Sequence, residues 1–347
     1  MTTSAAAAPP PPPGGRRGGL LAVHAHPDDE TLATGALLAT WTAAGGPATV
    51  VTCTRGERGE VIDTPSHPTG LSHLEGDGPT LAANRERELT GALSALGVAD
   101  HLFLDAWRDP AEASTTAPDA APRGPGERYE DSGMAWVAPG IAGPAADSGP
   151  TAFARVPLDD AARRLAGILR DRRPAVVVTY ESGGGYGHPD HVRAYQVTVR
   201  ALELAADPGA AVVGAAWAVP ERWEVVAPAA DLRAAQAALC HHPDAAAWVH
   251  DGLTLPDLDA ALPPVAVDAA EPADAEVVTL PVAPVLGQVI AALAAHATQV
   301  QHAAALDVPG VAGRYALSNG VLAPLLATAH LRVVRSRAQG PRGEGDG

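Results

Sequence analysis

The sequence predicts an α/β protein in which a mostly parallel sheet is flanked by helices. Short apolar runs of strand length alternate with longer segments of helical periodicity, and glycine or proline stands at most of the junctions. The clearest unit runs from a strand at Leu20–His24, through a helix that ends near Ala44, to a strand at Ala48–Cys53. Because two strands joined by a crossover helix are parallel and the connection is right-handed, we expect a Rossmann-like core.

The same alternation continues along the chain and places this core at residues 19–217. A helix is expected near 81–96, where the leucines share one face and Gly97 ends the periodicity. A Pro/Gly/Asp-rich segment at 106–150 interrupts the pattern, and so long a segment in a compact domain is a lid, a binding loop or disordered. The further elements expected here are a strand at 101–104, a helix at 158–171, a strand at 175–180, a helix after His191 and a strand at 211–217.

Residues 218–337 are expected to form a smaller C-terminal α/β subdomain that completes the same domain. Its helices are expected around 231–240, 285–300 and 320–330, and the order of the Ala/Pro/Asp-rich stretch at 243–284 stays open. Both ends of the chain lack a pattern that could bury them. We therefore expect a disordered Ala/Pro-rich tail at 1–18 and a frayed tail at 338–347.

The charge balance and the cysteine count restrict the class of protein. Of the 347 residues, 40 are Asp or Glu and 24 are Lys or Arg, which gives a net charge of −16 at pH 7. Because contact with phosphates needs clustered cations, nucleic acid binding is not expected. No uninterrupted apolar run is long enough to span a bilayer. The two cysteines, Cys53 and Cys240, are too few for a disulfide framework, so we expect a cytoplasmic protein with no membrane partner.

Two similar motifs stand at strand-to-helix junctions of the expected core. The first reads His-Pro-Asp-Asp-Glu at residues 26–30, and the second reads His-Pro-Asp-His at 188–191. Proline at the first position of a helix loses no needed hydrogen bond and keeps the residue before it extended. His26 and His188 should therefore project from the carboxyl edge of the sheet, where open α/β sheets bind ligands.

The side chains of these motifs predict a metal or catalytic site. Residues three apart at the start of a helix share a face, so His26 can meet Asp29 and His188 can meet His191. A metal ion held by two imidazoles and one carboxylate keeps coordination positions open for water and substrate, as is typical of a catalytic zinc site. The same donors suit Fe2+. Spacing alone does not decide which histidine of the second motif is a ligand.

Other patterns in the sequence are interpreted as turns or exclude a competing site. Residues 26–28 stand where a dinucleotide-binding protein has Gly-x-Gly-x-x-Gly, so a nicotinamide-dependent enzyme is not expected. A third His-Pro-Asp at 242–244 follows a helix rather than a strand, and we interpret it as a surface turn. The glycines around Tyr186 form either a simple turn or a flexible segment that brings the phenol over the metal.

The motifs together resemble the zinc-dependent N-acetylglucosaminyl deacetylases of the LmbE and PIG-L type. The resemblance extends from Gly19 to about His330, and it rests first on Ala-His-Pro-Asp-Asp-Glu at 25–30 with His-Pro-Asp-His at 188–191. The other matching segments are Val-Thr-Cys-Thr at 51–54, Gly-Glu-Arg-Gly-Glu-Val at 56–61, Asp-Ser-Gly-Met at 131–134, Gly-Gly-Tyr-Gly-His at 184–188 and Ala-Ala-His-Ala-Thr-Gln at 294–299. These are similar to the branch that removes acetate from an N-acetylglucosaminyl-inositol in mycothiol biosynthesis. The resemblance implies an LmbE-like fold, a small-molecule substrate and one Zn2+ per chain, with Fe2+ as the other candidate.

The resemblance also implies roles for single residues. The metal would be held by two imidazoles and one carboxylate, those of His26, His191 and Asp29. Asp28 would be the general base, and Tyr186 would polarise the acetamide carbonyl. His188 would stabilise the oxyanion and could protonate the leaving amine, with Asp190 orienting it. Outside the motifs, two residues would hold the hydroxyl groups of the sugar and the inositol, Arg85 and Asp131.

Two related functions remain as alternatives. Mycothiol S-conjugate amidases have the same fold and metal, but their second motif lacks the glycine between Tyr and His, so Gly187 favours the deacetylase. A non-catalytic sugar-binding protein on this fold would be expected to lack the base or a ligand, whereas the chain retains Asp28 and all the candidate ligands. The oligomeric state stays open.

Overall fold

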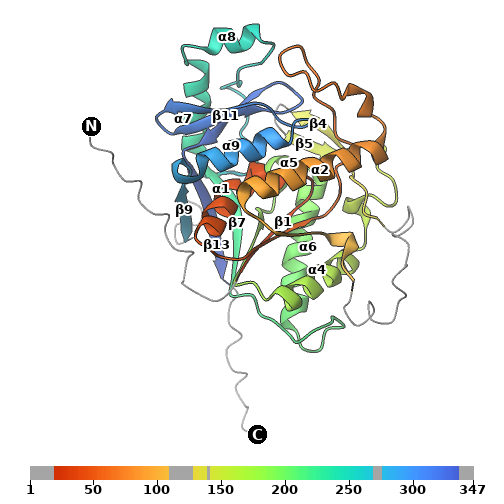
Figure 1. Cartoon of the computed structure of the whole chain (residues 1–347). Helices are drawn as coiled ribbons and strands as arrows, with labels where there is room; N and C mark the ends of the chain where they lie inside the picture. Colours follow the sequence, from red (N-terminus) through yellow and green to blue (C-terminus); the bar gives the residue numbers. More distant parts are fainter. Residues whose placement is uncertain (1–18, 109–127, 139–140, 269–275, 336–347) are drawn as a thin grey trace.

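An eight-stranded sheet forms the centre of the part that the computed structural model describes, residues 19–108, 128–138, 141–268 and 276–335 (Figure 1). In spatial order its strands are β3 (Asp100–Phe103), β2 (Ala48–Thr52), β1 (Leu20–His24), β6 (Val176–Tyr180), β7 (Glu221–Pro228), β13 (Thr328–Arg335) and β9 (Val277–Pro281), and the short β8 (Ala266–Val267) pairs with β7. The predicted tails at 1–18 and 338–347 lie outside the described residues, as does the part of the 106–150 segment from 109 to 127.

The direction of the strands confirms the mostly parallel sheet. All neighbours from β3 to β7 are parallel, and β13 is antiparallel to the strands on either side of it. From β1 the chain proceeds to β2 and β3 on one side, whereas β6 and β7 lie on the other side. The strand order therefore reverses between β1 and β6, and α/β proteins bind ligands at the carboxyl ends of the strands at such a point. The two His-Pro-Asp motifs follow these two strands.

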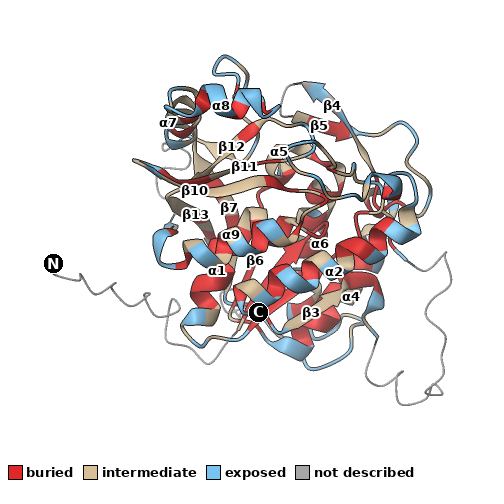
Figure 2. Ribbon diagram, turned by 45° about the horizontal axis from the view of Figure 1, so that its top comes forward, coloured by how far each residue is buried: buried red, intermediate tan, exposed pale blue. Residues whose placement is uncertain are grey.

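Helices cover both faces of the sheet. On one face lie α1 (Asp29–Ala43), α2 (Gly78–Leu96) and α9 (Leu286–Ala295), and on the other lie α4 (Leu158–Arg172) and α6 (Pro189–Ala206) (Figure 1). Along β1, Leu20 and Ala22 pack into the first of these layers, whereas Leu21 and Val23 pack into the second. Because successive side chains of a strand point to opposite faces, β1 is buried on both faces. The buried residues accordingly gather on the strands and on the helix faces turned toward them (Figure 2).

Residues after 218 extend the central sheet and also build a second, smaller one. Three strands form this antiparallel sheet, β10 (Gln301–Val308), β11 (Val311–Ala316) and β12 (Leu322–Leu326). A small apolar cluster joins it to α7 (Ala229–Cys240) and α8 (Ala245–His250). The third His-Pro-Asp, at 242–244, lies in the turn between these two helices, as predicted. A division at residue 217 stays a prediction.

The remaining short elements connect these layers. They are the hairpin of β4 (Met134–Ala138) and β5 (Ile141–Pro144), the short helix α5 (Gly184–Gly187), and the 3-10 turns η1 (Ser72–Leu74), η2 (Leu104–Ala106), η3 (Phe153–Arg155) and η4 (Ala283–Val285). Within the described ranges no helix has the length and apolar character needed to cross a membrane.

The strand predicted at 211–217 is wrong, and the strand of this region is β7. The carbonyl groups of Val212 and Gly214 accept hydrogen bonds from the buried Arg170 guanidinium of α4. The Trp217 indole donates to the carbonyl oxygen of Pro174 (3.0 Å). Because the two carbonyl groups bond to a side chain, they are not available to pair with a neighbouring strand, and the segment is irregular.

The helix predicted at 320–330 is also wrong, because these residues form β12 and the first part of β13. Pro324 would remove a hydrogen bond from a helix interior, and it is tolerated here because β12 is an edge strand. The helix predicted at 285–300 is shorter, since α9 ends at Ala295. The strands from β9 onward were not predicted.

Candidate metal centre

The two His-Pro-Asp motifs lie at the carboxyl ends of the adjacent strands β1 and β6. β1 ends at His24 and α1 begins at Asp29, so the first motif spans the turn between them and the first two residues of the helix. α6 begins at Pro189, and the His188 side chain caps this helix, its Nδ1 accepting the Asp190 N–H (3.1 Å). The structure confirms that both motifs stand at strand-to-helix junctions.

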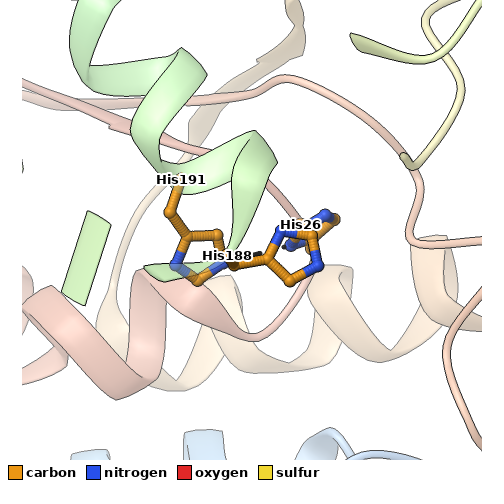
Figure 3. Close-up of side chains that lie close together, drawn as sticks. All are labelled: His26, His188 and His191. Carbon is orange, nitrogen blue, oxygen red and sulfur yellow. Dashed lines mark hydrogen bonds between the residues drawn. The ribbon is translucent and has the colours of Figure 1, made fainter. Parts of the chain in front are cut away.

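Three histidine rings converge between the motifs (Figure 3). The ring centroids of His26 and His188 are 4.6 Å apart, those of His188 and His191 4.9 Å, and those of His26 and His191 5.3 Å. All three side chains are buried. The ligand atoms of these three histidines lie close enough together to hold a metal ion, and so do those of His26, Asp131 and Asp190.

Asp29 adds a carboxylate at closer range to two of these rings. Its Oδ2 is 3.3 Å from Nδ1 of His26, and its Oδ1 is 3.2 Å from Nε2 of His191. The two ring nitrogens are 3.3 Å from each other. Ligand atoms about 2.0–2.1 Å from a zinc ion at tetrahedral angles lie about 3.3–3.4 Å apart. Each of these three distances therefore matches the spacing of two ligand atoms on a tetrahedral ion, with one Asp29 oxygen facing each ring.

Hydrogen bonds on the outer side of the rings determine where their lone pairs point. Nε2 of His26 lies 3.2 Å from Oδ2 of Asp190, and a ring hydrogen donated to this carboxylate leaves Nδ1 as the nitrogen that can bind a metal. Nδ1 of His191 lies 3.1 Å from the carbonyl oxygen of Gly184, which leaves its lone pair on Nε2. With these outer contacts made, Nδ1 of His26, Nε2 of His191 and the Asp29 carboxylate face one another. Two imidazole nitrogens and a carboxylate are ligands that a metal ion such as zinc prefers, so these residues fit a metal ion.

The Asp190 carboxylate acts on His26 and not on His188. We expected Asp190 to orient His188, but only its backbone N–H contacts that ring. The carboxylate is fully buried, and besides His26 it accepts the backbone N–H (2.8 Å) and the hydroxyl hydrogen of Ser132. This is the arrangement in which a carboxylate fixes the orientation of a metal-binding histidine. Ser132 belongs to the Asp-Ser-Gly-Met segment at 131–134, in which sequence analysis gave a role to Asp131 only.

Replacing Asp190 with alanine is expected to weaken metal binding about 10- to 100-fold, because His26 loses the group that directs its lone pair inward. Competition with a chelator of known affinity measures this change. The control is Asp100→Ala, which removes a carboxylate that pairs with Arg172 at the amino end of β3. Unchanged affinity in Asp190→Ala, or an equal loss in the control, would contradict the contact's role.

Asp28 stands beside the ligand atoms with an unusual backbone conformation. Its φ is 126°, a region that residues other than glycine rarely adopt. Its Oδ2 is 3.2 Å from Nη2 of Arg85. Burial raises the pKa of the Asp28 carboxyl from 3.8 to about 6, although the Arg85 guanidinium lowers it. A carboxylate with this pKa is suited to accept a proton near neutral pH.

Arg85 and Asp131 are both buried at this edge of the sheet. Nη1 of Arg85 donates to the carbonyl oxygen of Gly56 (2.7 Å), and Nη2 donates to that of Pro27 (2.5 Å). Arg85 therefore fastens the two loops that follow β1 and β2. Oδ1 of Asp131 accepts the Gly133 N–H (2.8 Å). That both residues hold substrate hydroxyls stays a prediction.

Tyr186 packs edge-on against the histidines. Its ring centroid is 5.0 Å from that of His191 and 6.0 Å from that of His188. Burial raises the pKa of the Tyr186 phenol well above 10, so the phenol keeps its hydrogen and can donate it. The next residue must be glycine, because Gly187 has φ 91° and a Cβ there would lie 2.7 Å from the carbonyl oxygen of Ala142.

His188 is neutral in this environment. Its Nδ1 accepts a backbone N–H, so the ring hydrogen is on Nε2. Burial lowers the pKa of His188 well below 6.5, and the neighbouring His26 and His191 lower it further. The ring thus presents its Nε2–H, and the role of His188 in protonating the leaving amine stays a prediction.

A comparison with known families decides where the chain belongs. Residues 21–202, which include both motifs and span more than half of the chain, match the model of the PIG-L family, described as GlcNAc-PI de-N-acetylase. The chain belongs to this family. Its fold is the LmbE-like α/β fold expected from the resemblance.

Relatives of this PIG-L chain match it over nearly its whole length, and three of them are named 1D-myo-inositol 2-acetamido-2-deoxy-alpha-D-glucopyranoside deacetylase. The protein from Kineococcus radiotolerans is 42% identical over 327 residues, which cover 93% of this chain and 79% of that protein. The protein from Streptomyces avermitilis is 37% identical over 329 residues, covering 93% and 94%. The protein from Rhodococcus erythropolis is 37% identical over 326 residues, covering 94% and 93%.

The PIG-L site also contains residues to which sequence analysis gave no role. Glu30 closes the first motif, and its carboxylate lies 2.7 Å from Nε2 of His296, with both side chains fully buried. His296 belongs to the Ala-Ala-His-Ala-Thr-Gln segment at 294–299. The segment could be singled out by its similarity to the family, but only the fold shows what the histidine contacts.

Proposed function

We propose that this chain is a metal-dependent deacetylase that removes acetate from 1-D-myo-inositol 2-acetamido-2-deoxy-α-D-glucopyranoside, as in mycothiol biosynthesis. The observation that carries the chemistry is the convergence of two imidazole lone pairs and the Asp29 carboxylate, 3.2–3.3 Å apart, beside the Asp28 carboxylate. The substrate is proposed from the three relatives, each of which is named as a deacetylase of this compound. The reaction is hydrolysis of a linear amide C–N bond.

We assign the metal to His26, Asp29 and His191, and we propose one Zn2+ per chain. The nitrogen and carboxylate donors and their tetrahedral spacing suit zinc, and Fe2+ can use the same donors. When bound, the ion supplies a Lewis acid that makes water more acidic and polarises the acetamide carbonyl.

Asp28 is the general base for the attacking water. Its Oδ2 is engaged by Arg85, so Oδ1 is the atom that accepts the proton. The pKa of about 6 leaves the carboxylate ionised at neutral pH but basic enough to take a proton during attack. Arg85 holds the carboxylate in this orientation.

Two neutral donors stabilise the negative charge that develops on the acetamide oxygen. His188 presents its Nε2–H, because Nδ1 is occupied by the Asp190 N–H. Tyr186 presents its phenol, whose pKa burial raises well above 10. Losing one such donor typically costs about 10²–10³ in kcat.

Asp28 also supplies the proton that the leaving amine needs. When the tetrahedral species breaks down, the C–N bond cleaves and the amine nitrogen takes a proton. Asp28 has just accepted one from the water, whereas neutral His188 uses its Nε2 hydrogen for the oxyanion. The products are the amine and acetic acid, which becomes acetate by passing its proton to the amine or to water, and Asp28 is ionised again.

We further propose that Asp131 binds hydroxyl groups of the substrate, because its carboxylate borders the histidines, 3.6 Å from Nε2 of His26. Arg85 contributes to the same subsite, although two of its nitrogens already hold backbone carbonyls. We place the reaction in the cytoplasm, where the thiols of Cys53 and Cys240 stay reduced.

The substrate is tested by comparing two amides. We expect a higher kcat/KM for acetate release from the acetylated glucosaminyl-inositol than for cleavage of a bimane S-conjugate of mycothiol, because Gly187 stands between Tyr186 and His188. Faster cleavage of the conjugate would assign the chain to the amidases. A metal-loaded protein that cleaves neither amide would contradict the proposed function.

A further inference from the structure

The backbone of Asp28 needs an external support. Its φ of 126° and ψ of −33° lie in a region that an L-residue keeps only when the surroundings impose it. The Asp28 N–H donates to Oε2 of Glu30 (2.9 Å). Its carbonyl oxygen accepts the N–H groups of Thr31 (3.0 Å) and Leu32 (2.9 Å), which belong to the first turn of α1. The Glu30 carboxylate is therefore the side-chain group that fixes the amide of this peptide.

Glu30 is itself held by a histidine from the far end of the chain. Its side chain is fully buried, and a buried carboxylate is costly unless it is paired. Oε1 of Glu30 accepts from the Thr31 hydroxyl (2.5 Å) and from Nε2 of His296 (2.7 Å). One carboxylate thus connects the Asp28 amide to the His296 ring.

His296 has a rigid setting. It follows the last residue of α9, its side chain is fully buried, and its N–H donates to the carbonyl oxygen of Leu293 (3.2 Å). Its carbonyl oxygen accepts the N–H groups of Gln299 (2.9 Å) and Val300 (2.8 Å). α9 packs against α1 and α2 in the core on this face of the sheet, where the two helices lie beside it (Figure 1). The ring therefore cannot move without the helix.

We propose that Glu30 and His296 are positioning residues that hold Asp28 in the conformation needed for general base catalysis. The inference rests on the proposed function, because it assigns Asp28 the role of base. Glu30 reaches Asp28 through the backbone amide, and Arg85 reaches it through the carboxylate. These two contacts fix opposite ends of the same residue. A purely structural pair would instead affect stability and leave turnover unchanged.

A double-mutant cycle separates the two roles. Glu30→Ala and His296→Ala are assayed for kcat and KM, each alone and in the Asp28→Ala background, with metal content and Tm measured on the same samples. We expect kcat to fall about 100-fold for Glu30→Ala, because a misplaced catalytic group costs about that much, with KM and metal content unchanged. In the Asp28→Ala background the same change should lower the residual rate less than about twofold, since there is no base left to position. His296→Gln, which keeps an N–H donor, should recover most of the activity that His296→Ala loses.

The matched control is Glu224→Ala. Glu224 is also a buried carboxylate of the central sheet and pairs with Arg332 of β13 (3.0 Å), away from the motifs. Its loss should lower Tm and leave kcat within about twofold of the unmodified enzyme.

Three results would overturn the inference while the proposed function stands: equal losses of kcat with and without Asp28, an unchanged kcat in Glu30→Ala, or loss of the metal. If Glu30→Ala does not fold, His296→Ala and His296→Gln carry the same comparison. An unmodified, metal-loaded enzyme that releases no acetate would refute the proposed function itself, and the inference with it.

Discussion

Asp28→Ala is expected to keep its metal and lose about 10³-fold in kcat. General base catalysis contributes about 10²–10⁴-fold, and the other two aspartates of the motifs are already engaged, because Asp29 faces the two histidines and Asp190 is bound to His26 and Ser132. The metal should remain because the side chain of Asp28 contacts Arg85 and not the ligand atoms. The rate of acetate release and the metal content are measured on one sample.

Asp28→Asn serves as the control for this experiment. It keeps the shape of the side chain and an oxygen for the Arg85 guanidinium, but it cannot take a proton. We expect its kcat to be as low as that of Asp28→Ala. If either variant retained more than about a tenth of the activity, Asp28 would not be the base.

His26→Ala is expected to lose both metal and activity. The change removes the Nδ1 lone pair and also the ring that links the site to Asp190. Because losing a carboxylate behind a ligand already costs about 10- to 100-fold in metal affinity, losing the ligand itself should cost more than 100-fold. Elemental analysis after gel filtration reports the bound metal, and acetate release should fall to the level of the metal-free protein.

The sequence supplies a control for this variant as well. His241 precedes the third His-Pro-Asp, and its exposed side chain contacts only the carbonyl oxygen of Ala237 on the preceding turn of α7 among the described residues. His241→Ala should bind metal and turn over substrate normally. One equivalent of tightly bound metal in His26→Ala would contradict the assigned ligand set.

A strand can be predicted from the sequence where the residues of the strand itself determine its hydrophobic pattern. β1 is buried on both faces and reads as an uninterrupted apolar run, so its limits could be predicted. β7 begins with Glu221 and Arg222, and its buried Glu224 pairs with Arg222 and also with Arg332, which is 108 residues further along the chain. From the sequence alone, a charged residue with so distant a partner is interpreted as a surface residue. β13 pairs with β7 along most of its length. Its first residues were predicted as a helix because the sequence alone does not show this distant partner strand.

The candidate site shows the same division between local and distant information. The two motifs predict an imidazole and carboxylate site at the sheet edge because residue types and proline positions are local. Spacing could not choose between His188 and His191; the resemblance implies His191, and the partner of each ring supports this proposal, the Asp190 N–H for His188 and the Gly184 carbonyl for His191. The contact of Glu30 with His296 joins residues 266 positions apart, so no spacing within a motif could reveal it.

The most direct test of the account is a metal titration of the metal-free protein under anaerobic conditions, with acetate release from the acetylated glucosaminyl-inositol as the readout. We expect the rate to rise in proportion to added Zn2+ and to stop rising at one ion per chain, because the proposed ligands His26, Asp29 and His191 form a single set. Fe2+ should give an endpoint at the same ratio. Full acetate release by metal-free protein, or a fully loaded protein that releases none, would contradict it.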